Sequence, residues 1–384
     1  MKRHIIPLGR IAGIPVGLDY SWFLIFALLT WMLANRYFPV ESPHWAPPLY
    51  WLASAATSVL FFLSILLHEL GHSAVALKYR VPVRGITLFV FGGVADIGAE
   101  PPSAKAELLI AIAGPAVSLA LAALCYALQL MTAGVELAHG IAKYLALINL
   151  ALAVFNMVPG YPLDGGRVLR AALWAVTGNL RRATMIAAAV GRGIGFLLIF
   201  FGVLRVFAGD LIGGLWTAFI GWFLESAAAG QMVQAVYREA LAGHTVAQAM
   251  SGKCGAVAAS LTLQQLIDEH ILATGQRCFL VNRGDRTIGL MTLSNVKAVP
   301  RAAWAATTVE RAMLPIAKTA RVNPETALSA AMQAMARAGV NQLLVVSGDE
   351  VVGMLRREDT VNYLTTLLEL GADGAARTSK SPRG

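Results

Sequence analysis

The chain has 384 residues, of which 57% are hydrophobic and only 14% are charged, and its mean hydropathy is +0.62. Soluble domains average about 25% charged residues, so this composition excludes a wholly soluble protein and indicates several membrane spans beside a smaller soluble domain. The formal net charge of +9 is interpreted as membrane topology and contact with lipid headgroups, and we expect no nucleic-acid partner. The three cysteines follow no CxxC spacing and predict neither a disulfide framework nor a cysteine-based zinc site.

Stretches that are long, apolar and poor in charge predict an α-helical polytopic membrane domain over residues 1–235. Six transmembrane helices are expected, at about residues 20–35, 50–77, 106–131, 141–158, 184–208 and 211–229. The basic segment 1–19 contains glycine and proline and shows no cleavage pattern, so we expect the first span to be retained rather than removed as a signal peptide.

The second span carries the motif His68-Glu69-Leu70-Gly71-His72 at the end of an uncharged run that starts at Tyr50. Residues four apart project from one face of a helix, so both imidazoles can bind one Zn²⁺, and Glu69 can take a proton from metal-bound water as general base. A chance match in a chain of this length is on the order of 1%. Ionisable residues inside a span are costly and mark functional sites. The motif therefore predicts a hydrolytic zinc centre rather than core packing.

Glycines mark two further features near this motif. Residues Gly85–Val94 are β-branched and aromatic and end in Gly92-Gly93, which predicts a small hairpin or sheet beside the site. The pair Gly114-Pro115 in the third span predicts a kink or a close approach between helices.

A helix-breaking segment, residues 156–166, follows the fourth span with Pro159, Pro162 and two successive glycines. Broken backbone at membrane depth is tolerated only where protein buries it or where it lines a wet cavity. A catalytic zinc site needs a third protein ligand, and Asp164 is the carboxylate in this context. An aspartate in such a turn is usually only a turn residue, but this turn returns the chain to the depth of His68. The other carboxylates considered lie outside such a motif: Asp96, Glu107 and Glu225.

Lysine and arginine counts predict the orientation in the membrane. The segments 1–19, 78–105 and 159–183 hold three, four and four of these residues, whereas 36–49, 132–143 and 205–211 hold one each. By the positive-inside rule the first set is cytosolic, so both termini and the predicted metal centre lie on the cytosolic side. We expect a multi-pass protein of the plasma membrane, or of the inner membrane of a bacterium.

A soluble α+β module with an internal repeat begins at about residue 243. The segment Thr245–Met250 recurs as Thr308–Met313, and each copy continues with a helix, a strand, a polar turn and a Gly-x-x sequence. This arrangement resembles a tandem pair of cystathionine-β-synthase (CBS) domains, expected in the cytosol. The expected bounds are 243–300 for the first domain and 306–370 for the second, followed by a disordered tail over 371–384.

The membrane part, residues 1 to about 230, resembles the site-2 protease family of intramembrane zinc metalloproteases, peptidase family M50. The motifs that carry the resemblance are His68-Glu69-x-x-His72, Phe91-Gly92-Gly93, Ala113-Gly114-Pro115 and Asn156-x-x-Pro159-x-x-Pro162-Leu-Asp164-Gly165-Gly166. The resemblance implies one Zn²⁺ per chain, bound by His68, His72 and Asp164, with Glu69 as the catalytic base. It further implies a core of the second to fourth spans and, as substrate, a transmembrane segment of a single-span protein.

Four residues are candidates for contacts with such a substrate. A helical peptide bond hides its carbonyl, so the substrate must unwind, and the strand near Gly92 and Gly93 could pair with the extended chain. Asn156 could donate to the oxyanion, although a helix C-cap is an equally good interpretation, and Asn149 is a weaker candidate. Wild-type turnover in Asn156→Ala would exclude the catalytic role.

The resemblance to a CBS pair suggests that this unit binds an adenine nucleotide, since such pairs often bind one between the repeats. The candidate residues are Thr292 and Asn295 in the first copy and Asp359 in the second. Each copy departs from the family pattern at one place, with Asn295 where an aspartate is expected and Arg356 where a hydroxyl is expected. The alternative is a dimerisation or gating module without a ligand, and calorimetry with adenine nucleotides separates the two.

The leading hypothesis is a zinc-dependent intramembrane endopeptidase, modulated by the CBS pair and forming a homodimer through it. The alternative of another class is a CBS-gated transporter or channel, favoured by the six spans, by glycine-rich helices among them and by polar residues at membrane depth. Against it, the spans show no internal repeat, and the motif at His68 is of a hydrolytic kind. A catalytically silent scaffold is disfavoured because every expected catalytic residue type is present.

Overall fold

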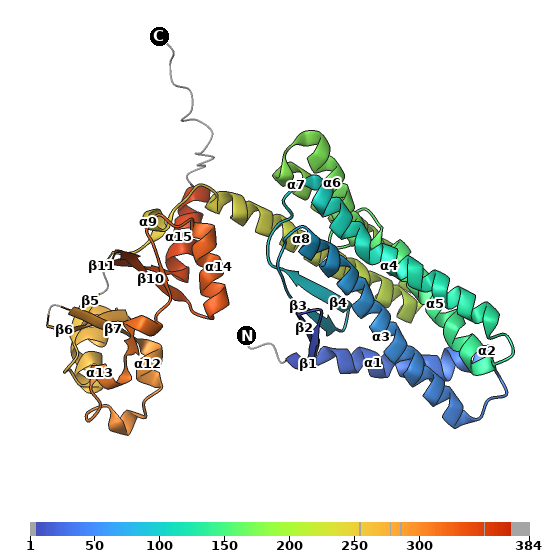
Figure 1. Ribbon diagram of the computed structural model, residues 1–384, viewed down its shortest axis with the longest axis horizontal. Helices are drawn as coiled ribbons and strands as arrows, with labels where there is room; N and C mark the ends of the chain where they lie inside the picture. The colour runs from blue at the N-terminus through green and yellow to red at the C-terminus, as the bar shows by residue number, and fades with distance from the viewer. Residues whose placement is uncertain (1–4, 253–254, 277, 285, 349, 370–384) are drawn as a thin grey trace, which may run out of the picture. The chain divides into compact units, whose positions relative to one another are not determined.

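The computed structural model describes residues 5–252, 255–276, 278–284, 286–348 and 350–369 (Figure 1). The predicted disordered tail, 371–384, lies outside the described residues. The chain divides into two compact units, Met1–Ala235 and Val236–Gly384, and each is considered by itself.

The first unit contains the six apolar helices that the sequence predicts, and they confirm the polytopic fold class. The helices long and apolar enough to span a membrane, within the described residues, are Ser21–Glu41, α3 (Pro47–Lys78), α4 (Ala104–Met131), α5 (Glu136–Asn156), α7 (Leu180–Phe207) and α8 (Leu211–Leu241). The first of them consists of α1 (Ser21–Met32), a π-helical turn (Leu33–Tyr37) and α2 (Phe38–Glu41). A seventh, shorter helix, α6 (Asp164–Thr177), follows the broken segment after α5.

Local sequence signals account for several helix ends. α3 begins with Pro47 and Pro48, whose fixed φ suits the first helical turn. Ser103 caps α4 and Asn179 caps α7, each with a side-chain oxygen that accepts a hydrogen bond from a backbone N–H in the first turn. Gly178, in the left-handed conformation, ends α6.

A four-stranded sheet lies beside α3 (Figure 1). Its strands are β1 (Ile5–Ile11), β2 (Ile14–Asp19), β3 (Val83–Phe89) and β4 (Gly92–Ile97), in the order β1-β2-β3-β4. The β3–β4 hairpin confirms the predicted β element. The segment 1–19 carried no strand prediction, yet its described residues, 5–19, form the β1–β2 hairpin, and β2 joins β3 in parallel register. That pairing links residues far apart in the chain and has no local sequence signal.

The helices α3, α4 and α5 pack side by side, as Figure 1 shows, and form the core of this unit. Small polar side chains bond where helices meet. Thr30 Oγ1 donates to Ser58 Oγ at 2.9 Å, and Asn149 Nδ2 donates to Ser64 Oγ at 3.2 Å. These bonds satisfy polar groups that apolar surroundings would otherwise penalise.

The described strands of the second unit form two small sheets, each built mainly from one repeat. The first has the order β5-β6-β7-β8, with β5 (Gly255–Ala258), β6 (Cys278–Arg283), β7 (Arg286–Thr292) and β8 (Leu314–Pro315). The second has the order β11-β10-β9, with β9 (Arg321–Val322), β10 (Gln342–Ser347) and β11 (Glu350–Arg356). The described α-helices are α9 (Val246–Ala249), α10 (Leu263–Gln265), α11 (Leu272–Thr274), α12 (Leu293–Lys297), α13 (Val309–Ala312), α14 (Leu328–Ala338) and α15 (Arg357–Glu369). A π-helical segment, Leu266–Ile271, joins α10 to α11, and Arg301–Ala303 and Ile316–Lys318 are short 3-10 helices.

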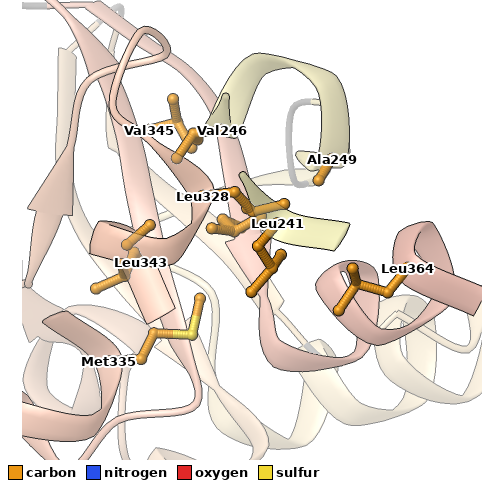
Figure 2. Close-up of a cluster of buried hydrophobic side chains, with 10 residues drawn as sticks. Leu241, Val246, Ala249, Leu328, Met335, Leu343, Val345 and Leu364 are labelled. Atoms are coloured by element: carbon orange, nitrogen blue, oxygen red, sulfur yellow. The ribbon is translucent and has the colours of Figure 1, made fainter. Parts of the chain in front are cut away.

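The repeated segment at the start of each copy packs into the other copy. Figure 2 shows Val246 and Ala249 of α9 in the apolar cluster of the second repeat, together with Leu328 and Leu343. Val309 of α13 is buried in the cluster of the first repeat, and β8 pairs with β7. The expected bounds assign each segment to the copy that follows it, whereas the packing joins it to the opposite copy.

Candidate metal centre

Three potential metal ligands converge from two helices. His68 and His72 lie one turn apart on α3 and are 3% and 4% exposed, and Asp164 is the first residue of α6. The Nε2 atoms of the two histidines are 3.1 Å apart, and each lies 3.2 Å from Asp164 Oδ2. Among the described residues, these three form a group whose ligand atoms all lie within 4.8 Å of one another.

The outer nitrogens of both rings are held by α4. His72 Nδ1 donates to the Ile110 carbonyl oxygen at 2.7 Å, which leaves Nε2 as the acceptor atom facing the centre. His68 Nδ1 lies 2.8 Å from Ser118 Oγ. Such partners orient metal-binding histidines and raise their basicity.

The spacing of the three atoms fits Zn²⁺. Ligand atoms at about 2.0–2.1 Å from a tetrahedral zinc lie roughly 3.3 Å from one another. The observed separations of 3.1 and 3.2 Å match this geometry, and two imidazoles with one carboxylate are a donor set that zinc accepts.

Gly114 gives the site its space. A Cβ atom placed on Gly114 would lie closer than 3.0 Å to the Nε2 atoms of both His68 and His72. The backbone of α4 therefore passes directly beside the ligand atoms, and only glycine leaves room there. This observation explains the Gly114-Pro115 pair as a close approach between α3 and α4.

Glu69 lies against the edge strand of the sheet. Its Oε2 accepts a hydrogen bond from the backbone N–H of Ala95 in β4 at 3.1 Å. A Cβ on Gly93 would lie 2.7 Å from Glu69 Cγ, so the strand approaches the carboxylate through a glycine. Gly92, with a φ of +118°, adopts a backbone conformation that disfavours other residues. Both candidate glycines thus belong to the strand that contacts Glu69.

The broken segment brings Asp164 to the histidines. α5 ends at Asn156, and α6 begins at Asp164. Cβ atoms on Gly165 and Gly166 would lie closer than 3.0 Å to the backbone of the preceding loop, so the two glycines let α6 start directly on that loop. Burial raises the pKa of the Asp164 carboxyl, but His68 and His72 together lower this pKa by more, so the group is held ionised.

The asparagine candidates lie on α5 and differ in their surroundings. Asn156 is partly buried at the last position of the helix, next to the segment that leads to Asp164. Asn149 is fully buried, and its Nδ2 donates to Ser64 Oγ and to the Leu145 carbonyl. These contacts give Asn149 a role in packing α5 on α3.

The nucleotide candidates in the CBS unit are engaged in local hydrogen bonds. Thr292 and Asn295 form the capping box of α12. Asp359 accepts hydrogen bonds from Ser251 Oγ and from the backbone and side-chain N–H groups of Arg356. A ribose would have to compete with these partners.

Several residues near the centre were missed in the sequence. Ser118 carried a usable signal, because it lies one helical turn after Gly114 and hence on the same face of α4. Glu107 was considered only as a zinc ligand; it is fully buried and instead pairs with Arg167 and Arg170 of α6. The backbone groups of Ile110 and Ala95 could be found only from the structure.

Comparisons with known proteins agree with the geometry. The profile of Peptidase family M50 matches residues 56–143 and 135–200, and the CBS domain profile matches residues 314–366. "Putative zinc metalloprotease Rip3" from Mycobacterium tuberculosis is 37% identical over 367 residues, which are 94% of this chain and 93% of that protein. "Putative zinc metalloprotease sll0528" from Synechocystis is 35% identical over 369 residues, 94% of this chain and 96% of that protein. The solved site-2 protease from Methanocaldococcus jannaschii shares 30% identity, with a TM-score of 0.43, and covers 60% of this chain and 95% of its own. The chain therefore belongs to peptidase family M50, the membrane metalloproteases, and carries a CBS domain in its C-terminal unit.

Proposed function

We propose that the chain is a zinc-dependent intramembrane endopeptidase that cleaves a transmembrane segment of a single-span membrane protein. The observation that carries the proposal is the convergence of His68, His72 and Asp164 within 4.8 Å, directly beside Glu69. Membership of a metalloprotease family supports hydrolysis over the CBS-gated transporter or channel.

Each residue has a defined task in this proposal. His68 Nε2, His72 Nε2 and Asp164 Oδ2 hold one Zn²⁺, which when bound supplies a Lewis acid for the substrate carbonyl and for the attacking water. Glu69 accepts the proton of that water and returns it to the leaving amine. The Ala95 N–H holds the Glu69 carboxylate in position. Asn156 is a candidate donor to the oxyanion.

The edge of β4 supports an extended substrate. In the described part of the chain, β4 pairs with β3 on one side only, and the Ala95 N–H on this strand contacts Glu69. An unwound peptide that adds to this edge would receive backbone hydrogen bonds next to the general base. Gly93 lets β4 lie directly against Glu69, which would place the added strand beside the general base.

Cleavage of a reporter protein with a single span tests this proposal. The full-length protein, purified in detergent, is expected to cut the reporter within its span, to lose activity in excess chelator, and to regain it with about one equivalent of Zn²⁺. Reporters whose span carries helix-breaking glycines should be cut faster than all-leucine reporters, because unwinding costs less. Cleavage that persists after zinc has been stripped would contradict the proposal.

The arginine and lysine counts support cytosolic termini in a plasma or inner membrane, with the centre on the cytosolic side. A reporter enzyme active only outside the cytosol, fused after residue 384, should therefore be silent. Three features of the CBS unit remain predictions. They are modulation of the proteolytic activity, binding of an adenine nucleotide near Thr292 and Asp359, and a homodimer that forms through this unit.

A further inference from the structure

A buried carboxylate and two arginines connect α4 to the helix that begins with Asp164. Glu107, in the first turn of α4, is fully buried. Its Oε1 accepts hydrogen bonds from Arg167 Nε at 3.1 Å and from Arg170 Nη2 at 2.5 Å. The side chains of Arg167 and Arg170 are 17% and 11% exposed. Both guanidinium groups are therefore largely removed from water and pair with the same carboxylate.

Arg167 lies three positions after Asp164 on α6, and Arg170 lies three positions further, so each residue neighbours the next on the helix surface. α4 also holds His68 and His72 through Ser118 and Ile110. One helix thus carries the outer contacts of the histidines and the anchor of the helix that bears the third candidate ligand.

The loop before α6 contacts the same cluster. The guanidinium of Arg170 lies 5.7 Å from the centroid of the Tyr161 ring. A phenol is uncharged near neutral pH, so the contact between Tyr161 and Arg170 is a cation–π interaction. Arg170 therefore contacts both α4 and the turn that precedes Asp164.

The cluster of Glu107, Arg167 and Arg170 contributes little net free energy to folding, because burying its charges costs desolvation energy. Within the described residues, Glu107 Oε2 and Arg170 Nε are buried without a hydrogen-bond partner. Buried ion pairs are weak evidence for stability, since desolvation offsets much of their attraction. Both guanidinium groups converge on the same carboxylate oxygen, Glu107 Oε1, so the two arginines are held at one point of α4.

We propose that Glu107, acting through Arg167 and Arg170, is a positioning residue that fixes the rotation and depth of α6 and so holds Asp164 Oδ2 at the two histidines. This inference rests on the proposed zinc site. Residues that orient metal ligands typically change metal affinity by about 10–100-fold when replaced.

The test is a zinc-affinity cycle on the purified full-length protein, measured by competition with a chelator. Glu107→Gln keeps the size of the side chain and is expected to weaken zinc binding by about 10–100-fold. In the Asp164→Asn background the same change is expected to have no further effect, because there is no carboxylate left to position. The visible spectrum of the Co²⁺-loaded Glu107→Gln protein should shift toward that of Asp164→Asn.

Glu225→Gln is the matched control. Glu225 Oε1 accepts a hydrogen bond from Arg192 Nε at 2.8 Å, so it forms an ion pair of the same kind between α7 and α8. This variant should keep wild-type zinc affinity. If Glu107→Gln does not fold, Arg167→Gln removes one arginine while Arg170 stays paired, and a smaller loss of affinity is expected.

Two results would overturn the positioning role: wild-type zinc affinity in folded Glu107→Gln, or an equal loss of affinity with and without Asp164, which is the signature of general destabilisation. His68→Ala separates this failure from that of the site. If His68→Ala keeps wild-type affinity, the zinc site itself is refuted; if it loses zinc and Glu107→Gln does not, only the positioning role falls.

Discussion

Replacement of Glu69 by glutamine is expected to abolish proteolysis while zinc stays bound. Glutamine has nearly the shape of glutamate, and its carbonyl oxygen can still accept the hydrogen bond from Ala95 N–H. It cannot accept a proton from water, so the cleavage rate should fall by about 10²–10⁴-fold, the usual contribution of a general base. Initial cleavage rates and zinc content per chain, measured on the same preparation, check both halves of the prediction.

The control for this variant is Glu136→Gln. Glu136, on α5, contacts Trp45 and His44 instead of the candidate centre, so the change should leave the rate and the zinc content unaltered. A wild-type rate in Glu69→Gln would remove Glu69 from the chemistry. Complete loss of zinc in the same variant would instead make the residue a ligand or a structural requirement.

Replacement of Gly114 by alanine is expected to empty the metal centre. The added methyl group would lie closer than 3.0 Å to His68 Nε2 and His72 Nε2, in space that the ligand atoms and the ion need. To relieve this clash, α4 must move away from α3. Overpacking of this kind lowers the free energy of unfolding by about 1–3 kcal/mol. Zinc content should fall from one per chain toward none, and proteolysis should fall with it.

Gly193 offers a matched comparison on another span. It lies within α7, and a Cβ atom there would meet nothing within 4 Å, so Gly193→Ala should keep both zinc and activity. Elemental analysis and thermal denaturation of the two variants separate a blocked site from a misfolded protein. A Gly114→Ala protein with one zinc per chain would show that the approach of α4 is looser than the geometry indicates.

The convergence of the three candidate ligands could be predicted from the sequence because its signals are local. The spacing of His68 and His72 fixes a shared helix face, and the prolines before Asp164 with the two glycines after it predict a break at membrane depth. The ion pairs of Glu107 could not be predicted, since they depend on how α6 packs against α4. Similarly, the pairing of β2 with β3 joins segments separated by α1 and α3, and neither segment encodes its partner.

In the CBS unit, too, the sequence predicts the local elements but not how they pack. The repeat of Thr245–Met250 as Thr308–Met313 is visible in the sequence and predicts two similar folds. Val246 and Val309 are apolar in both copies, so either segment would suit either core. Which repeat each of these two segments packs against therefore depends on the three-dimensional path of the chain and could not be predicted from the sequence.

The most direct test of the central claim is the zinc content of the full-length protein, measured by elemental analysis after purification without added metal. We expect one zinc per chain in the wild type and none in His68→Ala, with both proteins equally folded. A wild-type protein without zinc that takes up none when the metal is supplied, or a His68→Ala protein that keeps its zinc, would contradict the account at its centre.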